Sequence, residues 1–304
     1  MLHNNPFACL KLQLFFFALT SSFFAFAAPF EEFQTTRLKS TAGAGVASVL
    51  MDESTILNPA PIAMFNVSSI FFQRSGGDLD IDSNSGFGRT ERAKSTAIIV
   101  SDSNGGVSGS LSYLNQTQGI NERKRFGVSV SSMVGDRSAF GISYRFNKEE
   151  TNLDGLGMTK TSTRQGSFGI LHALSPSFTL GLVAVDPLKA VPGETKGIVG
   201  GQYVFNDFIS IMLDLGADYN NNLADSVLYR AAMQFKIYND FFLRFGAHDD
   251  KAIKEKGTGV GIGWVQPKLS IDFALRNSER SEDNLAATKD QKLKESSFSI
   301  SYRF

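Results

Sequence analysis

Charged side chains stand at alternating positions in segments that are otherwise apolar or small. They include five cations and two acids, namely Arg145, Arg230, Lys236, Arg244, Arg276, Asp214 and Asp272. Arginine makes bidentate, charge-assisted hydrogen bonds to carboxylates, so cations gathered on one face predict binding of a ligand that carries a carboxyl group. The same side chains can instead pair with one another, with water, or with acids of another segment such as Asp52 and Glu53. The sequence leaves both interpretations open.

Residue patterns for catalysis and metal binding are weak. His172 and His248 follow the N-terminal segment, and the acid beside His248, Asp249, would point to the opposite face of a strand. Residues 78–82 begin with the acidic spacing of a calcium loop but lack the glycine and the closing glutamate that such a loop needs. No phosphate loop, zinc pattern or nucleophile elbow is found in the sequence. We therefore expect no enzyme, no cofactor and no metal.

The final stretch shows which element positions the charged residues. Residues 297–304 alternate between small or charged side chains and large apolar ones, the latter being Phe298, Ile300, Tyr302 and Phe304. A barrel in a bilayer turns its apolar side to lipid and its polar side inward. This stretch resembles the closing strand of bacterial outer-membrane barrels. The resemblance implies that Tyr302 and Phe304 form the signal read by the outer-membrane insertion machinery.

Composition agrees with a barrel and excludes other classes. The chain has 304 residues, a formal net charge of zero and 42% hydrophobic residues. Its mean hydropathy of -0.08 is too low for a bundle of membrane helices, whereas alternating strands give such a value. Balanced charge provides no basic stripe for nucleic acid.

The N-terminal 27 residues predict a signal peptide that is removed on export. An apolar run over residues 12–26 is followed by Ala25-Phe26-Ala27, which has the pattern of a cleavage site. The run is too short to span a bilayer as a helix. The single cysteine, Cys9, lies before it, so the mature chain is expected to contain no cysteine.

Alternating segments after residue 65 predict an all-β, antiparallel transmembrane barrel of about 14 strands. Turn-forming residues at positions such as 135–136, 206–207 and 239–240 predict short connections. Between these lie longer polar stretches, which we expect to be external loops: 75–93, 115–124, 148–163, 186–195, 220–225, 249–256 and 277–294. This regular exchange of short and long connections places both termini in the periplasm of a Gram-negative bacterium.

Residues 28–65 do not follow the strand pattern. They are rich in glycine and small residues and contain Asn58-Pro59-Ala60, so they are too broken for a long helix and too apolar for a disordered leader. A barrel of this strand number leaves its lumen open. We predict that residues 28–65 fold into it as a plug, or hatch. The glycine face 257, 259, 261 and 263 predicts either a close approach to the wall or a tight curve of the barrel.

The series G-x-G-V-A, D-E-S, N-P-A and M-F within residues 43–65 is similar to the N-terminal hatch of the FadL family. That family comprises transporters of long-chain fatty acids and hydrophobic compounds, with relatives in protein secretion. The resemblance implies a fourteen-stranded barrel whose hatch gates the lumen through Gly43, Gly45, Asn58, Pro59 and Ala60. The fatty-acid transporters are longer and carry apolar external loops, whereas the stretches 148–163 and 277–294 here are polar.

These observations predict an outer-membrane channel through which small hydrophobic or amphipathic, fatty-acid-like molecules diffuse past the hatch. Its expected contacts are membrane lipid, the ligand and the insertion machinery. An apolar ligand pocket is predicted between hatch and wall, lined by Ile56, Leu57, Ile62, Met64 and Phe65. The alternative is a non-enzymatic barrel that serves as a scaffold for a secreted or periplasmic protein. A hydrolase would require His172 or His248 to be essential.

Overall fold

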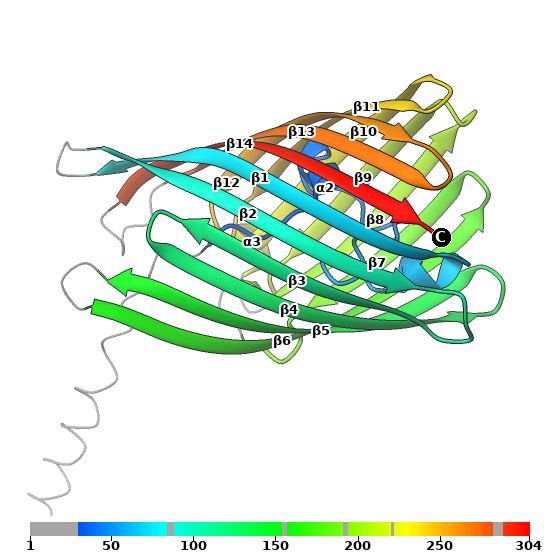
Figure 1. Ribbon diagram of the computed structural model, residues 1–304, viewed down its shortest axis with the longest axis horizontal. Coiled ribbons are helices and arrows are strands. Elements are labelled where there is room, and N and C mark those ends of the chain that lie inside the picture. Colours follow the sequence, from blue (N-terminus) through cyan, green and yellow to red (C-terminus); the bar gives the residue numbers. More distant parts are fainter. Residues whose placement is uncertain (1–29, 84–87, 154–156, 191–193, 220–221, 282–287) are drawn as a thin grey trace, which may run out of the picture.

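The chain forms one closed antiparallel barrel of 14 strands, in which each strand pairs with its sequence neighbours and β1 pairs with β14 (Figure 1). This computed structural model describes residues 30–83, 88–153, 157–190, 194–219, 222–281 and 288–304. The predicted architecture and strand number are confirmed. No helix in these ranges is long and apolar enough to cross a membrane.

The elements follow one another along the chain with few interruptions. Two short helices precede the barrel and a third lies between β9 and β10. The bounds are α2 Thr36–Ser40, η1 Ala60–Met64, β1 Ser68–Ser83, β2 Arg89–Asp102, β3 Ser108–Gln118, β4 Asn121–Val134, β5 Ser138–Leu153, β6 Gly157–Ser175, β7 Phe178–Val185, β8 Lys196–Phe205, β9 Ile209–Ala217, α3 Leu223–Ser226, β10 Val227–Tyr238, β11 Phe241–Asp250, β12 Glu255–Val265, β13 Leu269–Arg280 and β14 Thr288–Arg303.

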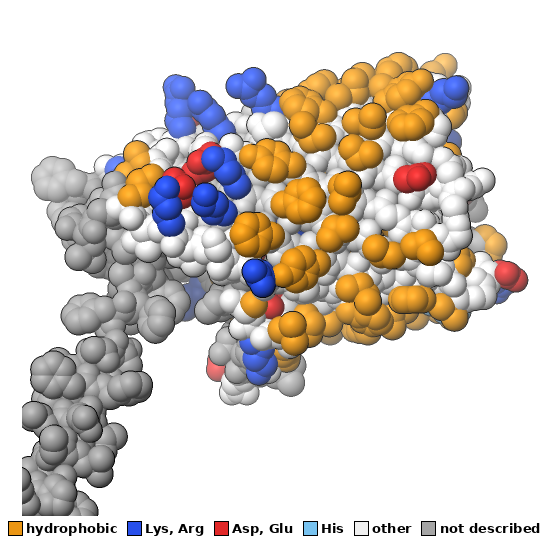
Figure 2. Space-filling model, turned by 60° about the horizontal axis from the view of Figure 1, so that its bottom comes forward, with side chains coloured by type: hydrophobic (Ala, Val, Ile, Leu, Met, Phe, Trp, Pro, Cys, Tyr) orange, Lys and Arg blue, Asp and Glu red, His pale blue; other side chains and the backbone are white. Residues whose placement is uncertain are grey.

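The two faces of the wall follow the alternation of the sequence. On β14, Phe298 and Tyr302 are 47% and 49% exposed, whereas Ser299 and Ser301 are buried in the lumen. The outward apolar side chains cover the middle of the wall, and charged side chains gather toward one end (Figure 2). Because neighbouring side chains of a strand point to opposite faces, one polar and one apolar surface arise from a single sequence period.

The polar stretches 75–93, 115–124, 148–163 and 277–294, which were predicted as long external loops, are largely strand, and this part of the prediction is wrong. In the described residues of 186–195 and 220–225 no strand is present, as predicted. Strand β1 continues to Ser83, and β3 and β4 are separated by Gly119 and Ile120 alone. The register between β5 and β6 runs unbroken from Ser138↔His172 to Leu153↔Gly157. Beyond the membrane a hairpin needs no apolar side chains, because backbone hydrogen bonds between the strands persist in water. Polarity therefore marks where the lipid ends, not where the strand ends.

The last strand closes the barrel at the end that carries the C-terminus. Ser68 and Phe304 exchange two backbone hydrogen bonds of 3.0 Å, which join the start of β1 to the end of β14. The rings of Tyr302 and Phe304 stack on the outer face with centroids 6.3 Å apart. Their role as an insertion signal stays a prediction. The segment predicted as a signal peptide lies outside the described residues.

Residues 30–65 lie inside the barrel and are mostly buried. The helix α2 lies against β11–β14, and η1 lies against β3–β6 (Figure 1). Between them, apolar hatch residues pack on inward-facing residues of the wall in one cluster: Phe33, Leu38, Val46, Ile56, Leu57, Phe71, Ala97, Ile99, Leu114, Val183, Val185, Ile198 and Leu228. The lumen thus contains its own hydrophobic core, which stabilises the hatch.

Candidate functional site: the hatch and the wall that holds it

The first anchor of the hatch joins its glycine-rich turn to β9 and β10. The carboxylate of Asp214 accepts hydrogen bonds from the backbone N–H groups of Gly45 (2.8 Å) and Val46 (3.2 Å). Arg230 donates to the carbonyl oxygen of Gly43 (3.2 Å). Gly43 and Gly45 have φ angles of 82° and 146°, which side chains with a Cβ rarely adopt. These two glycines therefore present their backbone to a charged pair on the wall.

A second anchor lies on the other side of the lumen. Arg145 on β5 is 1% exposed. Its Nε donates to the carbonyl oxygen of Thr55 (2.8 Å) and its Nη2 to that of Ile56. A buried guanidinium satisfied by backbone carbonyls fixes the path of the segment that supplies them.

The Asn58-Pro59-Ala60 element forms the third anchor. The side-chain amide of Asn58 donates to the carbonyl oxygen of Val46 (2.8 Å), and its Oδ1 accepts from the N–H of Ala60 (3.0 Å). Ser131 on β4 donates to the carbonyl oxygen of Ala60 (2.7 Å). Pro59 is the N-cap residue directly before the 3-10 helix η1, where its missing N–H removes no helical hydrogen bond. Asn58 thus connects the two halves of the hatch, because Val46 belongs to the first anchor.

Glycines on the inner wall leave room for the hatch backbone. A Cβ at Gly141 would lie 2.6 Å from the carbonyl carbon of Pro59, and one at Gly261 would lie 2.5 Å from the Cβ of Ser40. At Gly246 and Gly259 an added Cβ would overlap the backbone of α2 and the residue after it. Of the two interpretations of the glycine face on β12, the close approach is the one observed at Gly259 and Gly261.

The lumenal charges mostly contact the hatch or one another. Arg276 pairs with Glu31 of the hatch (3.0 Å) and with Glu255 (2.8 Å), and it lies wholly on the inner face. Arg244 pairs with Asp272 (2.5 Å). Among the described residues no ion pair involves the side chain of Lys236, which is half-buried near the end of β10. Their partners are other lumenal charges, hatch carbonyls and Glu31. Of the alternatives that the sequence left open, no ion pair of these cations with Asp52 or Glu53 is found among the described residues.

Several charged contacts inside the barrel were missed by the sequence reasoning. Lys39 of α2 pairs with Glu295 on β14 (2.5 Å). Arg123 and Arg125 on β4 lie 3.6 and 3.7 Å from Glu194. The alternation of β4 would have placed both arginines inward, since Phe126 and Val130 face lipid. No local pattern identifies the glutamates as their partners.

Glu53 provides a pH-dependent contact within the hatch. It is 5% exposed and accepts a hydrogen bond from Thr35 Oγ1 (2.9 Å), with Arg37 and Asp52 nearby. Burial raises the pKa of Glu53 from 4.5 to about 7. The folded hatch therefore binds a proton more tightly than the unfolded segment does.

We expect hatch stability to fall as pH rises from 4.5 to 7, because the ionised Glu53 is disfavoured only in the folded state. The full loss is about 3 kcal/mol, from 1.36 kcal/mol per pKa unit. Protection of residues 36–65 in hydrogen exchange, corrected for intrinsic rates, should be lower at pH 8 than at pH 5. Glu53→Gln should flatten most of this difference, leaving the smaller part due to Asp52, whose pKa burial also raises. An unchanged pH profile in that variant would exclude Glu53 as the cause.

The residues predicted to line a ligand pocket occupy the hatch–wall seam. Ile56 and Leu57 belong to the apolar core of the lumen, and Ile62 is fully buried in η1. Met64 packs at the edge of a second small cluster around Ala60 and Leu171, and Phe65 caps η1. Their role as a ligand pocket stays a prediction.

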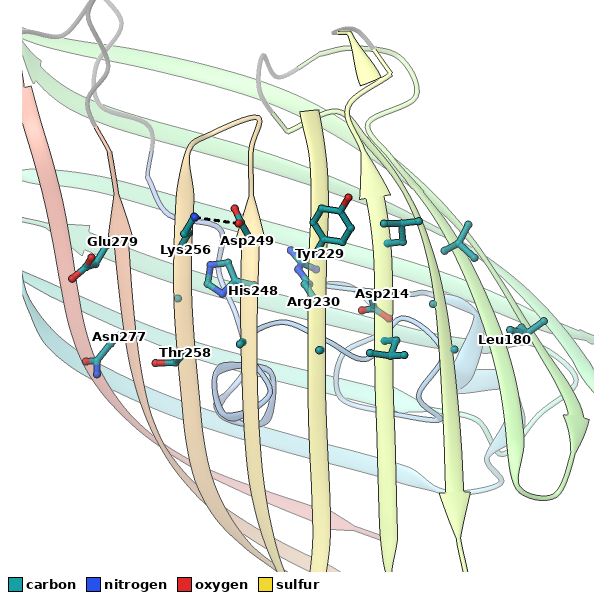
Figure 3. A pocket seen from close by; sticks show the side chains of 18 residues that line it. Leu180, Asp214, Tyr229, Arg230, His248, Asp249, Lys256, Thr258, Asn277 and Glu279 are labelled. Carbon is teal, nitrogen blue, oxygen red and sulfur yellow. Dashed lines mark ion pairs between the residues drawn. The ribbon is translucent and has the colours of Figure 1, made fainter. Parts of the chain in front are cut away.

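A hollow of about 930 Å³ lies elsewhere, on the wall between β7 and β13 (Figure 3). Most of its lining is outward-facing, with Leu213 and Leu215 exposed beside small residues such as Ala231 and Ala247. An ion pair between Lys256 and Asp249 (3.3 Å) lies at its polar edge. The lining also includes inward-facing residues that alternate with these: Gly200, Asp214, Arg230, His248 and Gly257. At this place a single layer of strand separates the outer hollow from the first hatch anchor.

His172 and His248, the histidines of the described residues, both have structural partners. His172 Nδ1 lies 2.8 Å from Ser138 Oγ, and His248 Nε2 lies 3.2 Å from Glu255 Oε1. Glu255 also accepts from Arg276 and Arg280, so it belongs to the inner charge network. Within the described ranges no group of three or more His, Cys, Asp or Glu could hold a metal ion.

Solved structures provide the comparison for this fold, whereas no protein-family model and no curated protein matches the sequence. The monoaromatic hydrocarbon channel CymD has a TM-score of 0.69 at 11% identity, over 91% of this chain and 99% of CymD. The toluene transporter TbuX of Ralstonia pickettii gives 0.65 at 12% identity, over 90% and 99%. A FadL homologue of Pseudomonas aeruginosa gives 0.58 at 14% identity, over 89% and 98%. The chain therefore has the fold of FadL-like barrels, as its hatch motif predicted.

Proposed function

We propose that this barrel is an outer-membrane channel through which small hydrophobic molecules diffuse passively past the hatch. The observation that carries the proposal is the hatch itself, which fills the lumen and is held by its backbone at a few wall side chains. Such contacts can be exchanged without unpairing any strand. The fold likeness to the hydrocarbon channel CymD and the toluene transporter TbuX supports the same function. In this proposal the protein is not an enzyme, and its termini face the periplasm.

The charges of the lumen favour a neutral cargo over a fatty acid. Arg145 and Arg230 already donate to hatch carbonyls, and Arg276 is paired with two glutamates. Drawing one of them to a ligand carboxylate would leave buried polar groups without partners, which costs about 1–3 kcal/mol each. The seam around Ile56 and Leu57 offers apolar contacts instead. A monoaromatic hydrocarbon satisfies these conditions.

Uptake by cells tests both parts of the proposal. Cells that lack their own hydrocarbon channel should accumulate labelled toluene faster when they express this chain, and labelled decanoate should show little change. Faster decanoate uptake alone would contradict the neutral cargo. If neither compound enters faster although the barrel is present in the outer membrane, the channel function is refuted. A single dominant protein cross-linked to the chain in intact cells would then favour the scaffold.

Deleting Asn58–Ala60 should change uptake without abolishing the barrel. This element holds the carbonyl oxygen of Val46 and contacts the wall through Ser131, so its loss frees both halves of the hatch. Folding is checked by the shift in gel mobility on heating. Asn58→Ala is the matched milder change, because it removes the amide bond to Val46 and keeps the chain length. Wild-type uptake in the folded deletion variant would exclude a gating role for the element.

A further inference from the structure

Cations on the outer face gather at the end of the barrel where β1 turns into β2, opposite the C-terminus (Figures 1 and 2). We call this end the hairpin end. The cations lie on β1, β2, β4, β5, β6 and β14. Along these strands they are nearer the hairpin end than the outward aromatic residues, such as Phe72, Phe126 and Phe146. We call them the basic belt: Arg74, Arg92, Lys94, Lys124, Lys148, Lys160, Arg164 and Lys294. The acids Asp78, Asp80, Glu122 and Glu150 lie among them. The formal net charge of the whole chain is zero, so this surface is a local concentration of positive charge.

Part of the belt surrounds a hollow of about 540 Å³ on the outer wall. Gly76 of β1 forms its floor, with Lys94 of β2 directly opposite on one side and Ser296 of β14 on the other. One row nearer the hairpin end, Asp78 lies between Arg92 and Lys294. No atom lies within 4 Å of the position that a Cβ of Gly76 would take, so the hollow is open.

The cations around this hollow have no acidic partner among the residues that the structure describes. In the described ranges no ion pair involves Arg92, Lys94 or Lys294, although Asp78 is the register partner of both Arg92 and Lys294. Other lysines at the same end are neutralised, since Lys256 pairs with Asp249 and Lys292 with Glu279, each at 3.3 Å. Glu295, which also lines the hollow, faces inward and forms an ion pair with Lys39 of the hatch. Among the described residues, the hollow is therefore a concave surface with an excess of positive charge.

The position of the hollow relative to the apolar surface of the wall indicates which kind of molecule it binds. Directly below lies Leu275, and Phe298 and Phe72 continue the apolar surface that contacts lipid. Side chains just above such a surface meet lipid headgroups, where an anionic group attracts cations. A phosphate offers acceptor oxygens to several donors at once. Free inorganic phosphate would contact the cations, but it has no acyl chain to contact the adjoining apolar wall.

We propose that the hollow over Gly76 binds the phosphate of a phosphorylated lipid of the surrounding leaflet, with its acyl chains along the apolar wall below. Lys94 and Lys294 hold the phosphate from two sides, and Arg92 adds a third donor group. Asp78 lies at the rim and disfavours a second phosphate beside the first. This inference requires that the barrel spans a membrane but not that it transports a particular cargo.

Native mass spectrometry of the full-length barrel in mild detergent can test the site. The probes are bisphosphorylated lipid A and phosphatidylcholine at equal concentration, with inorganic phosphate as competitor. We expect one lipid A to be retained in preference to phosphatidylcholine. The double variant Lys94→Gln with Lys294→Gln should weaken retention about tenfold or more, as expected for losing hydrogen bonds from charged donors. The double variant Lys256→Gln with Lys292→Gln removes the same charge from paired lysines and should retain lipid A.

A steric variant separates the hollow from general charge. Gly76→Tyr fills the floor while keeping every cation, and the open space around Gly76 lets it fold. It should also lose lipid A. Equal retention in Gly76→Tyr, or an equal loss in both double variants, would overturn the site. Displacement of lipid A by millimolar inorganic phosphate would show an anion site without lipid specificity and would also overturn the proposal.

Discussion

A disulfide between Thr55 of the hatch and Gly127 of β4 is expected to reduce uptake to the level of cells without the protein. A Cβ built on Gly127 lies 3.4 Å from the Cβ of Thr55, close to the usual separation in disulfides. The Oγ of Ser112 lies 2.5 Å from the same position and can rotate away. The cross-link fixes the segment that Arg145 holds by two carbonyls, so the hatch can no longer rearrange.

The expected effect is reversible, which distinguishes a hatch held by the disulfide (a lock) from a misfolded protein. The single cysteine of the chain, Cys9, lies in the predicted signal peptide, so the two engineered thiols have no competitor in the mature protein. Uptake of labelled toluene should return when the disulfide is reduced. Each single cysteine variant, treated with the same oxidant, serves as the control and should keep its uptake.

A second lock tests the other half of the hatch. A Cβ on Gly200 would lie 3.0 Å from the Cβ of Val46, although it would also displace the carboxylate of Asp214. If the Thr55–Gly127 lock leaves uptake intact and the Val46–Gly200 lock stops it, only the first anchor moves. Full uptake with both disulfides formed would refute gating by the hatch.

Enlarging the wall glycines under α2 is expected to open the lumen. A Cβ at Gly246 would overlap the backbone of Thr41, and one at Gly259 would overlap the carbonyl of Lys39. Backbone cannot rotate aside as a side chain can, so valine at both positions should displace the helix from the wall. Each overpacked site typically costs about 1–3 kcal/mol. The double variant should therefore admit small hydrophilic dyes and antibiotics that the native barrel excludes.

The matched control is Gly197→Val, because no atom lies within 4 Å of a Cβ built there. Both variants should keep the gel shift of a folded barrel, since neither change touches a strand–strand hydrogen bond. Sensitivity of cells to small hydrophilic antibiotics and dye entry into vesicles provide two independent measurements. If the Gly246 and Gly259 variant stays as impermeable as the control, α2 does not seal the lumen.

The sequence by itself determined the wall. Side chains alternate between the two faces of every strand, so residues such as Phe298 and Ser299 could be placed outside and inside without knowledge of any partner. The outward face must be apolar only over the height of the lipid. For that reason the sequence predicted the strand number but placed the hairpins of β1–β2 and β13–β14 too short, because their polar ends look like loops.

Only the tertiary structure decided which wall residue holds which part of the hatch. Arg276 meets Glu31, which is 245 positions away, and Lys39 meets Glu295 across 256 positions. Arg145 and Arg230 bind backbone carbonyls, which every residue possesses and no motif reveals. The alternation along a strand shows which charged side chains point into the lumen. Their partners depend on how the hatch, a separate and irregular segment, folds inside the closed barrel.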